Sequence, residues 1–98
     1  MQLYGIRRRN AWANAEELEA AGGRSTEEGN KPDSGVRWIR SYVLEEEDGR
    51  LGSYCIYEAE SPEAIRRHAE ASGFSADEIH KTVDTVIVRP DPQPAAAS

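Results

Sequence analysis

Residues 36–58 read VRWIRSYVLEEEDGRLGSYCIYE and hold two stretches rich in aromatic and β-branched residues, one on either side of a turn. Residues 36–44 predict the strongest strand of the chain, and residues 53–58 predict the strand that returns beside it. Asp48-Gly49 is typical of a tight turn, within a loop at 45–52 that is longer than two residues. This stretch therefore predicts a β-hairpin.

The chain before the hairpin predicts a strand followed by a helix. Residues 2–8 (QLYGIRR) indicate the strand, and Asn10 is a suitable cap for a helix that begins near Ala11 and extends over 11–28. Apolar residues recur there at three-residue spacing: Trp12, Ala15, Leu18 and Ala21. Gly22-Gly23 interrupts the pattern, so the helix either ends there or continues weakly.

The chain after the hairpin predicts a second helix and a last strand. Ser61-Pro62 is typical of a helix start and Gly73 of a helix end, which gives a helix over 62–72. A capping box at 75–78 predicts one further short turn, and residues 80–88 predict the last strand. The Pro- and Ala-rich residues 90–98 predict a disordered tail after a single domain at 1–89.

This order of elements, βαββαβ, predicts an α+β sandwich of the ferredoxin-like class. Its four-stranded antiparallel sheet carries both helices on one face, and the bare face then favours a second copy of the chain or a ligand. Strict alternation along the hairpin would place a set of polar and aromatic side chains on one surface of the sheet: Trp38, Arg40, Tyr42, Cys55 and Tyr57. If this surface is a homodimer interface, its expected anchors are Trp38, Tyr42 and Tyr57. The alternative is that these rings simply pack in the core.

Composition narrows the class of protein further. The 98 residues carry 12 basic and 18 acidic side chains, a net charge of −6, which disfavours nucleic acid as a partner. No stretch is apolar and long enough to predict a membrane span or a signal peptide. Cys55 is the one cysteine, so no intramolecular disulfide is expected, and the cytoplasm is the expected location.

Three side chains are good ligands for soft or borderline metals: Cys55, His68 and His80. Their spacing matches no compact metal motif, so they could converge only through the fold. Each has another interpretation, since Cys55 could be a core residue, His68 could complement a helix dipole and His80 could face solvent. The chain also lacks the GxSxG, GxxxxGK[ST] and GxGxxG motifs, so no complete catalytic motif is present.

The segments GVRWIRSYV at 35–43, YCIYEAESPEAIRRHAEASG at 54–73 and SADEIHKTVD at 75–84 resemble a family of small bacterial ferredoxin-like proteins. That family, once a domain of unknown function, is named for nickel-responsive or nickel-binding proteins. The resemblance implies at least a dimer and binding of nickel or a similar divalent metal. Its most recognisable segment contains Cys55, Tyr57, Glu58 and His68. The first helix departs from the family pattern at Gly22-Gly23.

Together these observations predict a homodimeric protein that sequesters or senses a nickel-type divalent metal without catalysis. The predicted ligands are Cys55 and His68, supplemented by His80, Tyr57 or Glu58. One alternative is a small dimeric enzyme of the cyclase, isomerase or monooxygenase type that uses the bare sheet face as its pocket, with Arg40, Tyr42 and His68 as acting groups. Another is a module that only binds a partner.

Overall fold

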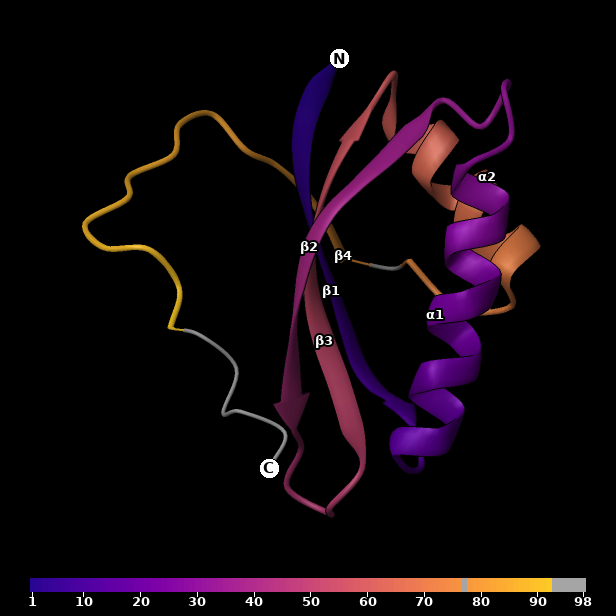
Figure 1. Ribbon diagram of the computed structural model, residues 1–98, viewed down its shortest axis with the longest axis vertical. Coiled ribbons are helices and arrows are strands. Elements are labelled where there is room, and N and C mark those ends of the chain that lie inside the picture. Colours follow the sequence, from indigo (N-terminus) through magenta and orange to yellow (C-terminus); the bar gives the residue numbers. More distant parts are fainter. Residues whose placement is uncertain (77, 93–98) are drawn as a thin grey trace.

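The computed structural model describes residues 1–76 and 78–92 and has the predicted ferredoxin-like architecture. Its elements, in chain order, are β1 (Gln2–Trp12), α1 (Ala15–Gly29), β2 (Val36–Glu45), β3 (Leu51–Ala59), α2 (Pro62–Ser72) and β4 (Glu78–Lys81). The strands form one antiparallel sheet in the order β2-β3-β1-β4, and both helices lie on the same side of it (Figure 1). Within the described residues, no helix has the length and apolarity needed to cross a membrane.

The predicted hairpin is confirmed as β2 and β3. Gly49 occupies the left-handed region with φ +82°, and the Glu46 amide closes the loop by donating to the Arg50 carbonyl at 2.8 Å. β3 begins at Leu51, two residues before the predicted start, because Leu51 still pairs with Glu45 on β2. β3 also pairs with β1, so the hairpin forms the centre and one edge of the sheet.

The predicted boundary between the first strand and the first helix is wrong. β1 continues to Trp12 through a register shift between Arg8 and Trp12, where Asn10 adopts φ +50°. Asparagine tolerates this left-handed conformation better than most residues, so Asn10 bends the strand rather than capping a helix. The cap is Asn14, whose side-chain oxygen accepts the Glu17 amide at 3.0 Å. Trp12 is therefore a buried strand residue.

Helix α1 continues through Gly22-Gly23 to Gly29, which resolves the alternative that the sequence left open. Two of its side chains, Ala21 and Ser25, are buried on either side of this pair. Packing of those positions against the rest of the domain outweighs the cost of about 1 kcal/mol per helical glycine.

Helix α2 spans Pro62–Ser72, as predicted. The Ser61 hydroxyl oxygen accepts the Ala64 amide at 3.2 Å, and Gly73 ends the helix with φ +85°. Pro62 takes the first helical position, where its missing N–H is not needed. All the signals that define this helix are local, which is why the sequence predicts its bounds.

The prediction of a strand over 80–88 is wrong beyond Lys81. β4 pairs with β1 from Arg7 to Tyr4, and the Thr82 amide still donates to the Leu3 carbonyl at 2.9 Å. β1 begins at Gln2, so the following residues have no strand left to pair with. Residues 82–92 instead leave the sheet on the side away from the helices (Figure 1), and they expose Val83, Val86, Ile87 and Val88.

The capping box does not produce a helical turn, since Ser75 and Ala76 are irregular and Glu78 begins β4. Asp77 lies outside the described residues. So do residues 93–98, which make up most of the predicted tail.

The sheet has an inner face toward α1 and α2 and an outer face away from them. The inner face carries the core: Tyr4, Ile6, Val36, Cys55, Tyr57 and Ala59, packed on Ala64 and Ile65 of α2. A β-bulge at Ile39 changes the alternation of β2, because Trp38 pairs with Tyr57 while Arg40 pairs with Ile56. Trp38 therefore lies on the inner side, and Arg40 and Tyr42 lie on the outer face.

The predicted single surface of Trp38, Arg40, Tyr42, Cys55 and Tyr57 is therefore corrected to two surfaces on opposite sides of the sheet. Tyr57 is 1% exposed on the inner face, so it is not an anchor on the bare face. Of the three expected interface anchors, only Tyr42 remains on the outer face, where it is 42% exposed.

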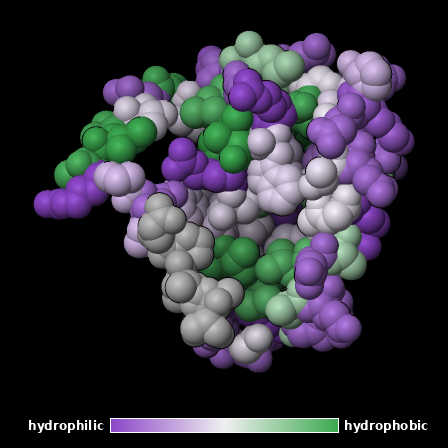
Figure 2. All heavy atoms as spheres, viewed as in Figure 1, coloured by the Kyte–Doolittle hydropathy of each residue, from purple (hydrophilic) through white to green (hydrophobic). Residues whose placement is uncertain are grey.

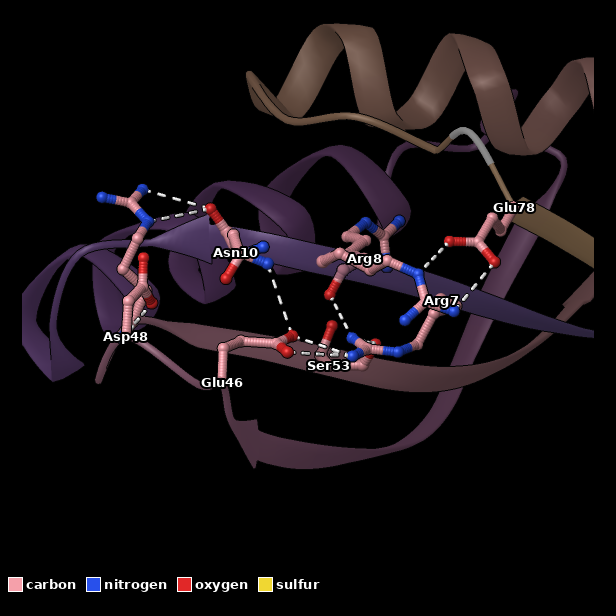
Figure 3. Close-up of polar contacts among 9 residues, drawn as sticks. Arg7, Arg8, Asn10, Glu46, Asp48, Ser53 and Glu78 are labelled. Atoms are coloured by element: carbon pink, nitrogen blue, oxygen red, sulfur yellow. Dashed lines mark hydrogen bonds and ion pairs between the residues drawn. The ribbon is translucent and has the colours of Figure 1, made fainter.

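A charged cluster holds the hairpin loop against β1. The Arg7 guanidinium donates to both carboxylate oxygens of Glu46, at 2.8 and 3.2 Å, and Glu46 also accepts the Asn10 amide at 3.3 Å. Figure 3 shows this contact, with the Arg8 side chain leaving β1 on the opposite side. The hydrogen bonds from Arg7, followed by that from Asn10, keep the pKa of Glu46 below its usual value, although desolvation opposes the shift.

Candidate functional site

The predicted ligands divide between the two faces of the sheet. Cys55 and Tyr57 lie on the inner face of β3, and His68 approaches the same side from α2. Glu58 lies on the outer face of β3, where it pairs with Arg37 at 3.1 Å. His80, on β4, pairs with Gly5 of β1 and is exposed, also on the outer face. A single ion within one chain therefore cannot contact all the predicted ligands.

His68 is 4% exposed and is held by α1 and β3. Its Nε2 donates to the Ser25 carbonyl oxygen at 2.9 Å, and its ring lies 5.5 Å from that of Tyr57. Burial, together with the positive charge of Arg8, lowers the pKa of His68, although the bond to Ser25 opposes the shift. The imidazole is therefore neutral near pH 7, with its proton on Nε2 and a lone pair on Nδ1.

The Nδ1 atom of His68 is buried and has no hydrogen-bond partner among the described residues. His68 also lines a small cavity of about 140 Å³, together with the acidic Glu28 and Asp33 and the basic Lys31 and Arg67. A ring whose Nε2–H is held by a backbone carbonyl and whose Nδ1 is free has the tautomer that metal sites use. It also leaves one polar atom unsatisfied in the absence of a ligand.

Tyr57 and Cys55 differ in their readiness to bind metal. The Tyr57 hydroxyl lies 3.0 Å from the Ser25 hydroxyl, and burial raises the pKa of Tyr57, which disfavours the phenolate that a metal requires. The Cys55 Sγ accepts a hydrogen bond from Ser41 at 2.8 Å and lies 3.3 Å from the Ser53 hydroxyl. Cys55 and His68 have no hydrogen-bonding partner in common.

A larger cavity of about 400 Å³ lies between the inner face and α1. Its walls are mostly aromatic and apolar, with some polar groups among them; they include Arg8, Trp12, Trp38, Cys55, Tyr57 and Phe74. In Figure 2, hydrophobic and weakly polar residues gather between the region of β2 and that of α1, while the outer side of α1 is hydrophilic. This size is within the range of small-molecule sites.

Sequence reasoning missed Arg8, Ser25 and Phe74, and only Arg8 had a usable signal. Tyr4, Ile6 and Arg8 alternate along β1, so the pattern places Arg8 on the inner face beside the core. Ser25 falls one turn after Ala21 on a helix that the sequence left uncertain at Gly22. Phe74 falls between the predicted helix end at Gly73 and the capping box at 75–78, where the sequence gives no pattern.

A family model described as nickel responsive protein SCO4226-like matches residues 4–82. The chain belongs to this family. The crystal structure of SCO4226 from Streptomyces coelicolor A3(2) is similar in fold, with a TM-score of 0.68 and 22% sequence identity. The alignment covers 86% of this chain and 99% of that one. No significant match was found among curated proteins. The resemblance read from the hairpin and the second helix is thus confirmed.

Membership in a nickel-responsive family raises the question of whether these residues fit a metal. Among residues 1–76 and 78–92, no group of three or more His, Cys, Asp or Glu side chains is placed to hold an ion. A tetrahedral or octahedral site needs more protein ligands than one buried imidazole. Within one chain, the described residues therefore do not complete a coordination shell.

Proposed function

We propose that this protein binds a divalent transition metal of the nickel type, for sequestration or sensing rather than catalysis, with His68 as its principal ligand. The observation that carries the proposal is the neutral His68 ring, whose Nε2 donates to the Ser25 carbonyl and whose Nδ1 has no partner within residues 1–76 and 78–92. Imidazole nitrogen suits Ni²⁺, Zn²⁺ and Cu²⁺ and is a poor ligand for Mg²⁺. The family description points the same way.

The other predicted ligands lie on both faces of the sheet. Cys55 and Tyr57 lie on the same side as His68, and the carboxylates of Glu28 and Asp33 line the small cavity beside it. Glu58 and His80 lie on the outer face, so they stay on the far side of the sheet from His68, even in a homodimer joined through that face. We propose that the ligands beside His68 come from the inner side, and that the chain also forms a homodimer through its outer face.

Calorimetry with Ni²⁺ on protein purified without a histidine tag tests the proposal. Native protein binds, Mg²⁺ gives no heat, and His68→Ala lowers the affinity by at least about ten-fold, a change of roughly 1.4 kcal/mol. His80→Ala is the matched control, since it removes an exposed imidazole from the other face. Cys55→Ser then reports whether the thiol contributes.

The outcomes separate the two groups of ligands. Loss of binding in His68→Ala with binding retained in His80→Ala supports the inner site. The reverse result moves the metal to the outer face and refutes His68 as principal ligand. Binding unchanged in both variants, or absent from the native protein, refutes the metal assignment.

The enzymatic alternative is not supported by the geometry. Arg40 and Tyr42 lie on the outer face, where both contact Asp91, whereas His68 lies behind the inner face. Arg40, on the edge strand, also lines the inner cavity, but the sheet separates Tyr42 from His68, so the three groups cannot act together on one substrate within a chain.

A further inference from the structure

The wall of the cavity of about 400 Å³ carries a buried positive charge. Arg8 lines this cavity and is 2% exposed. Its Nε donates to the Ser75 carbonyl oxygen at 2.7 Å, and its guanidinium carbon lies 4.5 Å from the centre of the Phe74 ring. Its Nη2 is buried without a hydrogen-bond partner, and no carboxylate of the described residues forms an ion pair with it.

A guanidinium stays charged in proteins even when it is buried. Burying such a charge is costly unless an anion or a full set of acceptors compensates it. The Ser75 carbonyl and the face of Phe74 satisfy only part of the group. Carboxylates are the natural partners, since they accept two parallel hydrogen bonds from the guanidinium fork.

The other side chains that line the cavity determine which kind of molecule fits beside Arg8. The indoles of Trp12 and Trp38 and the ring of Phe74 contribute to its walls, and Trp38 remains 40% exposed. Walls of this kind favour a flat, apolar body, which loses water on entering and stacks against the rings. A buried cation in a mostly apolar cavity is the pattern of sites that orient a small amphipathic ligand by a single polar end. Arg40 also lines this cavity, but it is exposed and its guanidinium pairs with Asp91 at 3.2 Å.

We propose that this cavity binds a small, flat, largely apolar carboxylic acid, with its carboxylate on the Arg8 guanidinium and its body among Trp12, Trp38 and Phe74. This ligand site differs from the proposed metal site in its principal contacts, because it uses neither the imidazole of His68 nor the outer face, although Cys55 and Tyr57 also line the cavity. A metal is not required for the ligand to bind.

The probe is 2-naphthoate, compared with the uncharged 2-naphthamide, both added to the native protein in the presence of a chelator. Binding is followed by the amide and indole N–H signals in ¹H–¹⁵N spectra. Naphthoate binds more tightly than naphthamide and shifts the indole signals of Trp12 and Trp38. Arg8→Met weakens naphthoate by about ten-fold or more and leaves naphthamide within about two-fold, since one charge-assisted contact is lost. Arg8→Lys retains part of the preference for naphthoate over naphthamide.

A second pair of variants keeps the test decisive if Arg8→Met does not fold. A Cβ added at Gly22, which lines the cavity, would lie 4.0 Å from the Trp38 ring, whereas one added at Gly23 meets nothing within 4 Å. Gly22→Leu fills the cavity and abolishes binding of both probes, and Gly23→Leu binds like the native protein. Equal affinity of the two probes, naphthoate binding unchanged in Arg8→Met or Gly22→Leu, or no saturable binding to native protein overturns the proposal.

Discussion

The indole of Trp38 lies parallel to the ring of Tyr57, with centroids 6.1 Å apart and an interplanar angle of 8°. The two residues pair across β2 and β3, and the bulge at Ile39 follows directly. Trp38 thus covers Tyr57 from the side of the cavity, while Tyr57 reaches Ser25 on α1. This contact links the edge of the sheet to the helix layer.

The hydroxyl of Tyr57 should contribute measurably to stability. Tyr57→Phe removes its hydrogen bond to Ser25 at 3.0 Å in a buried setting. We expect the free energy of unfolding in urea to fall by about 1 kcal/mol. Tyr42→Phe is the matched control, because its hydroxyl contacts Asp91 on the exposed outer face, and it should change stability by less than about 0.5 kcal/mol. Equal effects in both variants would contradict the assignment of Tyr57 to the inner face.

At Gly5, the structure predicts that adding a side chain lowers the stability of the protein. A Cβ at Gly5 would overlap the Tyr54 hydroxyl and lie 2.7 Å from Cζ of that ring. Gly5→Ala should therefore destabilise the protein by about 1–3 kcal/mol, because Tyr54 must move. Most of that cost should vanish in a Tyr54→Ala background, as a double-mutant cycle would show. Gly23→Ala, with open space around it, should instead stabilise α1 by up to about 1 kcal/mol.

Elements with local signals could be predicted from the sequence, and those set by distant contacts could not. Ser61, Pro62 and Gly73 define α2 through bonds to their own neighbours, so its bounds were predicted. The bulge at Ile39 depends on how β2 pairs with β3, and strict alternation therefore placed Trp38 on the same face as Arg40 and Tyr42. The end of β4 depends on where β1 begins, which no pattern in residues 80–88 reveals.

In the candidate site, too, features with local signals could be predicted and features set by distant contacts could not. Alternation on β3 correctly places Cys55 and Tyr57 on one face and Glu58 on the other. The carbonyl of Ser25, which fixes the His68 ring, lies on a helix whose continuation past Gly22-Gly23 depends on tertiary packing. Arg8 was readable from its position after Tyr4 and Ile6, but an arginine in a core pattern is easily assigned to the surface.

The proposed homodimer should form through the outer face. Sedimentation equilibrium of the native protein should give twice the chain mass of 10.9 kDa. Ile56 lies half-buried at the middle of that face, paired with Gly5 and Arg40, so Ile56→Lys should shift the protein toward monomer. Ala20→Lys adds the same charge on the exposed side of α1 and should leave the mass unchanged. A native protein that sediments only as a monomer at micromolar concentration refutes the homodimer.

The last prediction concerns the pH dependence of stability. Burial lowers the pKa of His68 in the folded protein below that of an ordinary imidazole, about 6.5 in the unfolded chain. As the pH falls through that range, the unfolded chain takes up a proton at His68 before the folded protein does. Stability therefore rises with pH in this window and is lost progressively as the pH falls from about 7 toward the lowered folded pKa.

Urea unfolding at pH values from about 7.5 to 5.5, with a chelator present, measures this dependence above the range where most carboxylates titrate. His68→Gln should be less stable at pH 7.5, because the glutamine does not reproduce the buried ring, and its stability should vary less with pH than that of the native protein. His80→Gln removes an exposed imidazole and should leave the native slope in place. If His68→Gln keeps the native slope, the buried imidazole is not the group that titrates. If His80→Gln loses it, the exposed ring is responsible, and the neutral His68 on which the metal proposal depends loses its support.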